Sequence, residues 1–203
     1  MRRAQLTVYV VEDDASVRDS LALMLGLGGY RTALFPDAES FLSAYRDDWT
    51  GCVVADLRLP GKSGIELQAE LRARKSALPF VIITAHADVP TVRAAFHADA
   101  VDFLEKPFDH AHLRAAIERA FSREGHRLQR AADNAKLAAL TARERDVLEH
   151  AAMGLHAKEI AAKLGISPRT VEVHKTRIME KLGVRNIGEL VRFAIAAQPR
   201  EER

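Results

Sequence analysis

The chain has 203 residues, of which 48% are hydrophobic, and its 30 basic and 28 acidic side chains leave a formal net charge of +2. A chain of this length can bury two small cores, since domains commonly span roughly 100–200 residues. The lone cysteine, Cys52, excludes an internal disulfide and a thiolate zinc cluster. No apolar run approaches the roughly 18 residues of a membrane span, and the N-terminal Met-Arg-Arg leads into a strand pattern without a cleavable leader. These features predict a cytoplasmic protein with no membrane partner.

The charge is unevenly distributed. Residues 1–120 contain 14 basic and 17 acidic side chains, whereas residues 121–203 contain 16 basic and 11 acidic ones. Because nucleic acids bind basic surfaces, only the second part is a candidate for nucleic-acid binding.

Five short apolar runs alternate with helical periodicity in the first part. Strands are expected at 6–11, 30–35, 51–56, 79–84 and 100–105, and helices at about 15–27, 37–45, 64–73, 88–97 and 109–121. Each run is short enough to be a strand buried on both faces. Because each parallel strand pair needs a crossover that covers the sheet, the pattern predicts an α/β fold with a doubly wound five-stranded parallel sheet.

The second part is helical throughout. Residues 122–140 are charged and alanine-rich, which indicates a partly helical linker. Thr141 and Glu144 have the spacing of a capping box, and further helices are expected at 157–164, 168–182 and 186–197. The predicted domains are therefore 1–121, a linker at 122–137, and a small all-α helix-turn-helix domain at 138–203.

Five polar side chains lie at the carboxyl ends of predicted strands: Glu12 and Asp13 end the first, Asp56 the third and Thr84 the fourth, and Lys106 follows the fifth. Ligands of open parallel sheets bind at these carboxyl ends. Clustered carboxylates suit Mg²⁺, whose octahedral coordination leaves a position for a phosphate oxygen. One of the carboxylates could then attack phosphorus as a nucleophile. Lys106 and Thr84 would then contact the phosphoryl oxygens. The pattern predicts a site that accepts a phosphoryl group.

Each of these residues also has an ordinary explanation, such as a helix cap, a strand end or a surface charge. Their joint placement at strand ends favours the common site. A haloacid-type hydrolase is disfavoured, because no Asp-x-Asp follows a strand.

The segment KEIAAKLGISPRTVEVHKTRIMEKLG has the pattern of two short helices packed on each other. Gly165 permits the turn between them, and Ser167 with Pro168 begins the second helix. Such a second helix places side chains in the major groove of DNA. The residues expected to contact DNA are Lys158, Arg169, Thr170, Glu172, Val173, His174, Lys175, Thr176 and Arg177.

Their expected roles differ. Lys175 and Arg177 are expected on an exposed turn, in contact with phosphates. Val173 would touch a thymine methyl group. Glu172 is either a base reader, a brake on non-specific binding, or the partner of Lys175 in a pair within the helix. For His174 a phosphate contact or a packing role is favoured over a metal or pH-sensing role.

The motifs VVEDD, DLRLPGKSG, IITAH and FLEKPF, within residues 5–121, resemble the receiver domain of bacterial two-component response regulators. The resemblance implies that Asp56 accepts phosphate from a sensor histidine kinase. It implies that Glu12, Asp13, Asp56 and the backbone carbonyl of Arg58 hold Mg²⁺, Glu12 through a water molecule.

The same resemblance implies a cis peptide bond between Lys106 and Pro107. It also matches Thr84 and Phe103 to the pair of switch residues whose rotamers follow phosphorylation. A strand aromatic such as Phe103 is ordinarily a core residue, so both roles stay open for it.

Residues from about 138 to 197 resemble the LuxR/NarL-type helix-turn-helix, and the whole chain resembles the FixJ branch of these regulators. A transcription regulator within a phosphorelay is implied, whose only catalysis is its own phosphotransfer and slow dephosphorylation. Its partners would be promoter DNA, RNA polymerase and a second copy on phosphorylation. Two alternatives remain: a phosphotransfer sink, disfavoured by the intact helix pair, and a constitutive DNA-binding protein with a silent receiver, disfavoured by the complete acidic set.

Overall fold

The computed structural model describes residues 6–85, 89–186, 188–191 and 193, of which Val89, Thr91, Ala94 and Phe96 are described by their backbone alone. By its internal contacts the chain divides into two compact units, Met1–His126 and Arg127–Arg203, which are described separately. The sequence-based bounds of 1–121, 122–137 and 138–203 stay a prediction. None of the described helices is long and apolar enough to cross a membrane.

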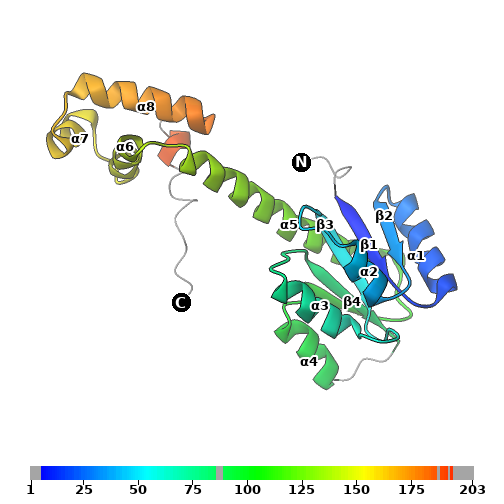
Figure 1. The fold of residues 1–203 in the computed structure, drawn as a ribbon. Helices are drawn as coiled ribbons and strands as arrows, with labels where there is room; N and C mark the ends of the chain where they lie inside the picture. Colours follow the sequence, from blue (N-terminus) through cyan, green and yellow to red (C-terminus); the bar gives the residue numbers. More distant parts are fainter. Residues whose placement is uncertain (1–5, 86–88, 187, 192, 194–203) are drawn as a thin grey trace. The chain divides into compact units, whose positions relative to one another are not determined.

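The first unit is built on a five-stranded sheet with the order β2-β1-β3-β4-β5 (Figure 1). Its strands are β1 (Thr7–Val11), β2 (Arg31–Phe35), β3 (Gly51–Asp56), β4 (Phe80–Thr84) and β5 (Asp102–Glu105). All neighbouring strands are parallel, which confirms the doubly wound sheet. Because β1 pairs with both β2 and β3, strands are added first on one side of β1 and then on the other. Ligands of such sheets bind at this point.

Four helices connect the strands, α1 (Ala15–Leu27), α2 (Ala38–Ala44), α3 (Gly64–Ala73) and α4 (Val89–His97), and α5 begins at His110 after the last strand. One core packs α2 and α3 against one face of the sheet and includes Phe41, Leu67 and Ile82. Successive residues of a strand point to opposite faces of the sheet, and Val10 and Val54, on the other face, are also fully buried. Both faces of the central strands are therefore covered.

The expectation that every strand is buried on both faces is correct for β3 and β4 and wrong for β2 and β5. All residues of β3 and β4 are buried, whereas β2 exposes Arg31 and Leu34 and β5 exposes Glu105. The two outer strands have a neighbouring strand on one side only, so their side chains are less completely covered.

Helix α5 runs continuously over His110–Ala138, 29 residues, and so includes most of the segment expected to be a partly helical linker. The segment is alanine-rich and contains no proline, which favours a continuous helix. The amide of Gln129 also donates to Asp133 Oδ1 one turn later, at 2.9 Å.

The second unit contains α6 (Ala142–Ala152), α7 (Ala157–Leu164) and α8 (Pro168–Leu182). The predicted capping box of Thr141 and Glu144 is confirmed, as is the turn at Gly165, whose φ of 66° is left-handed. A separate core joins the three helices through Val147, Ile160 and Ile178. Within the helix predicted at 186–197, residues 188–191 and 193 are helical, and six of its positions lie outside the described residues.

Candidate functional site

Three carboxylates meet at the carboxyl end of the sheet. Glu12 and Asp13 follow β1, and Asp56 is the last residue of β3. One oxygen from each lies within 4.8 Å of the others. Glu12 is 1% exposed and Asp56 7% exposed, whereas Asp13 lies at the surface. The strand ends therefore bring these three residues together as the sequence predicts.

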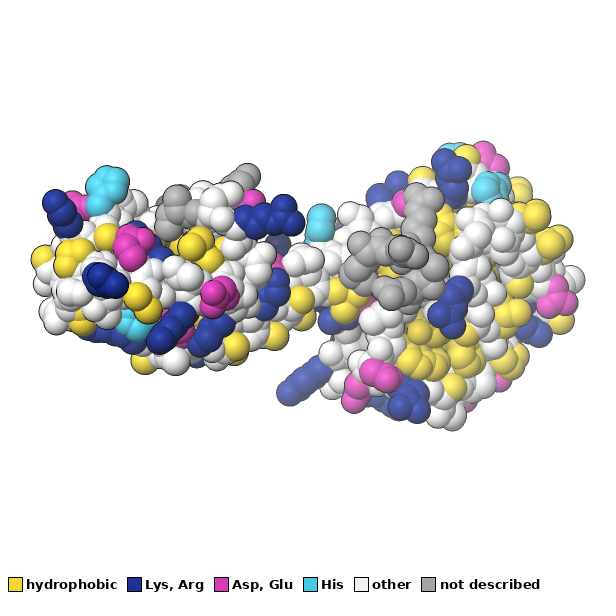
Figure 2. Space-filling model, turned by 90° about the horizontal axis from the view of Figure 1, so that it is seen from above, with side chains coloured by type: hydrophobic (Ala, Val, Ile, Leu, Met, Phe, Trp, Pro, Cys, Tyr) yellow, Lys and Arg dark blue, Asp and Glu magenta, His cyan; other side chains and the backbone are white. Residues whose placement is uncertain are grey.

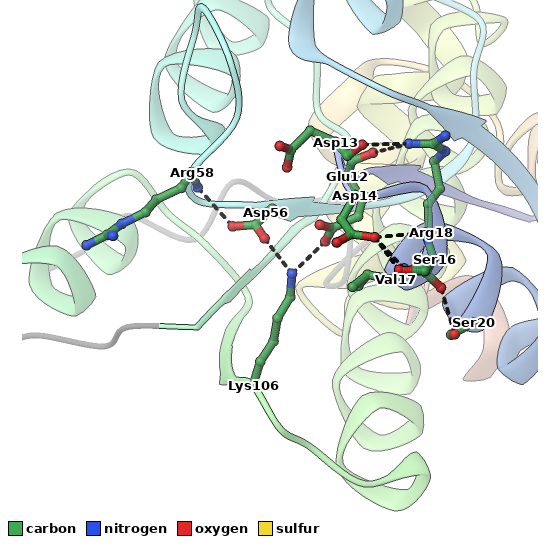
Figure 3. A network of polar contacts seen from close by, with 10 residues as sticks. All are labelled: Glu12, Asp13, Asp14, Ser16, Val17, Arg18, Ser20, Asp56, Arg58 and Lys106. Atoms are coloured by element: carbon green, nitrogen blue, oxygen red, sulfur yellow. Dashed lines mark hydrogen bonds and ion pairs between the residues drawn. The ribbon is translucent and has the colours of Figure 1, made fainter.

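Lys106, which follows β5, reaches the same point (Figure 3). Its Nζ lies 2.7 Å from Glu12 Oε2 and 2.5 Å from Asp56 Oδ2. The Lys106 backbone N–H donates to the Thr84 carbonyl at 2.7 Å, and the peptide bond to Pro107 is cis, as expected. One ammonium group thus bridges two of the three carboxylates.

The site shifts the ionisation of its own groups. Burial raises the pKa of Glu12, as does the neighbouring Asp56 carboxylate, and the hydrogen bond from Lys106 opposes this only in part. Burial alone would lower the pKa of Lys106, but its bonds to Asp56 and Glu12 raise it above the ordinary value. Lys106 therefore carries the positive charge that offsets this acidic cluster.

The donor set fits a hard divalent cation. Carboxylate oxygens are the ligands that Mg²⁺ takes in proteins, and Glu12, Asp13 and Asp56 supply three of them. Arg58 lies beside them, because its backbone N–H donates to Asp56 Oδ1 at 2.9 Å. The role of the Arg58 carbonyl as a ligand stays a prediction.

Thr84 and Phe103 lie on the same face of the sheet. Thr84 is fully buried at the end of β4, and Phe103 pairs with Ile82, two residues before Thr84 on that strand. Phe103 is half-buried and packs against the core that includes Ile82. This arrangement suits both a core aromatic and a switch residue, so the switch role stays a prediction.

The loop between β1 and α1 is held from two sides. Asp14 caps α1 by accepting from the backbone N–H groups of Ser16 and Val17, and hydrogen bonds from Ser16 and Val17 lower its pKa. Arg18 donates to the carbonyls of Glu12 at 2.7 Å and Asp13 at 3.2 Å. Arg18 is not among the site residues predicted from the sequence, although a cation in the first turn of the helix that follows the acidic pair is a usable signal.

Helix α8 carries most of the residues expected to contact DNA. Arg169, Glu172, Val173, Thr176 and Arg177 are exposed, as is Lys158 on α7, while Thr170 and His174 are half-buried. His174 Nδ1 is buried and has no hydrogen-bond partner among the described residues, which suits the packing role weighed for it.

The expected exposure is wrong for Lys175. Its side chain is only 13% exposed, and its Nζ pairs with Glu172 at 3.1 Å. Of the three roles considered for Glu172, the structure therefore contains the pair within the helix. The long aliphatic part of lysine is readily buried while its ammonium group reaches a partner.

The C-terminal end of α8 is anchored by a buried acid. Glu144 is 3% exposed and accepts from Lys181 Nζ at 2.6 Å and from the Thr141 N–H at 2.8 Å. The bond from Lys181, followed by that from Thr141, lowers the pKa of Glu144 to about 2. Lys136 also donates to the Leu182 carbonyl at 2.9 Å. These contacts fix α8 against α6 and the end of α5.

On the face shown in Figure 2, basic side chains of the second unit are interspersed with acidic ones. Net charge alone therefore does not locate a DNA surface on this unit.

The comparisons agree with both units. Residues 8–118 match the response regulator receiver domain family, and residues 138–194 match the luxR family of bacterial regulatory proteins. The chain is 43% identical over 194 residues to the transcriptional regulatory protein FixJ of Bradyrhizobium diazoefficiens, covering 94% of this chain and 95% of the relative. It is also 43% identical over 197 residues to FixJ of Rhizobium meliloti, with 94% and 95% covered.

Two solved structures match over nearly the whole chain. The response regulator StyR has a TM-score of 0.74 at 41% identity, covering 95% of this chain and 99% of that one. Full-length FixJ from B. japonicum has a TM-score of 0.62 at 42% identity, covering 96% and 98%.

Proposed function

Because this chain belongs to the two-component response regulators of the FixJ type, we propose that Asp56 is its phosphoacceptor and that phosphorylation there controls promoter binding. Membership of this family makes the protein a transcription factor rather than an enzyme. The receiver implies a kinase partner, and the helix-turn-helix implies DNA binding. One observation carries the proposal: Asp56 is the only carboxylate of the acidic cluster that ends a strand and also contacts Lys106 among the described residues.

The chemistry follows from the site. A carboxylate oxygen of Asp56 attacks the phosphorus of a phosphohistidine, the P–N bond breaks, and the departing imidazole nitrogen takes a proton. Lys106 then moves from neutralising Asp56 to contacting the phosphoryl oxygens, and the Thr84 hydroxyl donates to one of them. The N–H of Arg58 holds Asp56 in place during the approach.

Mg²⁺ is the cofactor of this proposal. Glu12, Asp13 and Asp56, with the Arg58 carbonyl, would hold it, Glu12 through a water molecule. When bound, the cation neutralises charge on the phosphoryl oxygens. Support comes from the three carboxylate oxygens within 4.8 Å of one another.

The output is proposed for α8. Arg169 and Arg177, which are exposed, are assigned to phosphates, and Val173, 45% exposed, to a thymine methyl group. Lys158, Thr170, His174 and Thr176 complete the proposed contact surface, and Glu172 and Lys175 enter it as a pair. A cytoplasmic location, a dimer formed on phosphorylation and contact with RNA polymerase belong to the same proposal.

The test is phosphorylation of the full chain with acetyl phosphate and Mg²⁺, followed by intact-mass spectrometry. One phosphoryl group should be added to the wild-type protein, and none to Asp56→Asn or in the presence of EDTA. Labelling of Asp56→Asn at the wild-type rate would show that another residue is the acceptor. DNA binding unchanged by phosphorylation would favour the sink or the constitutive binder.

A further inference from the structure

Arg18 links helix α1 to the backbone that carries two of the three clustered carboxylates. It lies in the first turn of α1, and its side chain turns back along the loop that connects β1 to α1 (Figure 3). One guanidinium nitrogen donates to the carbonyl oxygens of both Glu12, at 2.7 Å, and Asp13, at 3.2 Å. A single planar cation thus holds two consecutive peptide groups of the loop.

This position is electrostatically unusual for a cation. The N-terminal end of a helix carries partial positive charge and favours acidic side chains such as the capping Asp14, whereas Arg18 places a cation in the first turn, which has no acidic residue of its own. The two carbonyl acceptors offset this cost, because hydrogen bonds from a charged donor are among the strong ones in proteins. Arg18 is half-buried, which limits the competition from water for these bonds.

The bonds also bear on the carboxylates. The side chains of Glu12 and Asp13 contribute oxygens to the three-carboxylate cluster, while Arg18 holds their carbonyls. Like charges repel, and one oxygen of each of the three carboxylates lies within 4.8 Å of the others. This repulsion favours a loop conformation in which the carboxylates are farther apart. Lys106 opposes this repulsion at Glu12 and Asp56, and Arg18 opposes it through the backbone of Glu12 and Asp13.

We propose that Arg18 is a positioning residue for the magnesium site, acting by fixing the peptide groups of Glu12 and Asp13 so that their carboxylates stay converged. The proposal rests on the proposed function of this cluster. The Arg18 guanidinium is bonded to the carbonyls of Glu12 and Asp13 and so acts on the site through the backbone. Groups that orient metal ligands commonly change metal affinity about 10- to 100-fold when they are removed.

The experiment measures Mg²⁺ binding directly, by isothermal titration calorimetry and by ¹H–¹⁵N NMR shifts of the loop amides, on the full chain. Arg18→Ala should raise the dissociation constant about tenfold or more, and Arg18→Lys, which keeps the charge, should recover part of the affinity. At saturating Mg²⁺, the rate of phosphorylation by acetyl phosphate should return to within about twofold of wild type, because the reacting groups are unchanged.

Arg31→Ala is the matched control, since it removes an exposed arginine of β2 with the same change of charge. Arg18→Gln replaces Arg18→Ala if the alanine variant does not fold. The proposal is overturned if Arg18→Ala or Arg18→Gln binds Mg²⁺ as tightly as Arg31→Ala does. If instead the wild-type protein fails to bind Mg²⁺, it is the proposed function that fails.

Discussion

Gly64 lies where a side chain would collide with the backbone of the proposed phosphoacceptor. A Cβ atom at this position would overlap the carbonyl oxygen of Asp56 and lie 3.3 Å from Leu57 Cα. Gly64 also donates its N–H to the Leu57 carbonyl at 3.0 Å. The first residue of α3 therefore packs directly on the end of β3, and only glycine permits this approach.

We expect Gly64→Ala to shift the end of β3. The overlap should lower the free energy of unfolding by about 1–3 kcal/mol and slow phosphorylation by acetyl phosphate, because Asp56 would move relative to Lys106. The measurements are urea unfolding and the rate of phosphoryl uptake at saturating Mg²⁺.

Gly26→Ala is the control for Gly64→Ala. Gly26 lies in α1 with open space where a Cβ would be added, so alanine there should raise helix stability by up to about 1 kcal/mol. Equal phosphorylation rates for the two alanine variants would contradict the packing argument.

At the scale of elements, the Glu144–Lys181 pair adds a polar contact to the apolar core that joins α6 and α8. The pKa of Glu144 is lowered from 4.5 to about 2, so the unfolded chain takes up a proton at a higher pH than the folded one. The stabilisation is therefore fully present above pH 4.5 and is lost as the pH falls towards 2.

We expect Lys181→Met to destabilise the second unit at pH 7 by about 1–3 kcal/mol, because it leaves the buried Glu144 carboxylate without one of its hydrogen-bond donors. The loss should shrink as the pH falls towards 2 and Glu144 takes up a proton. Hydrogen exchange of the α6 and α8 amides at pH 7 and in acid measures it. Lys163→Met, at an exposed position of α7, is the control, and an equal effect of both variants would remove the special role of the pair.

At the scale of the whole molecule, the proposed switch requires phosphorylation to alter self-association. The surface made by β5 and the first half of α5 carries charged groups, including the exposed Arg119 and Arg123, which pair with Asp102 and Asp99 within the chain. Phosphorylation adds up to about two negative charges at the neighbouring strand ends. A two-fold dimer would present two copies of α8 to paired DNA half-sites.

Sedimentation velocity tests this step. With acetyl phosphate and Mg²⁺, the sedimenting mass of the full chain should increase from that of a monomer to that of a dimer. The Asp56→Asn variant should remain monomeric under the same conditions. A phosphorylated wild-type protein that stays monomeric both free and on DNA would remove dimerisation from the mechanism.

The sequence by itself determined that the sheet is parallel, that its strands alternate with helices along the chain, and which residues lie at its carboxyl end. Glu12, Asp56 and Lys106 are far apart along the chain, yet each lies at or just after the end of a short apolar strand, and parallel strands must end at one edge of their sheet. The helix pair followed in the same way from apolar spacing, with Gly165 between the helices. Such periodicities encode which face of an element is buried, and they do not depend on neighbours.

The tertiary structure decided which side chains are partners. The contacts of Lys106 with Glu12 and Asp56 join residues separated by 94 and 50 positions, and no local pattern specifies them. Only the folded chain shows the bonds of Arg18 to the loop carbonyls, the burial of Lys175 beside Glu172 and the exposure of the outer strands. The physical reason is that these features depend on the space left between packed elements, whereas the local pattern fixes only the elements themselves.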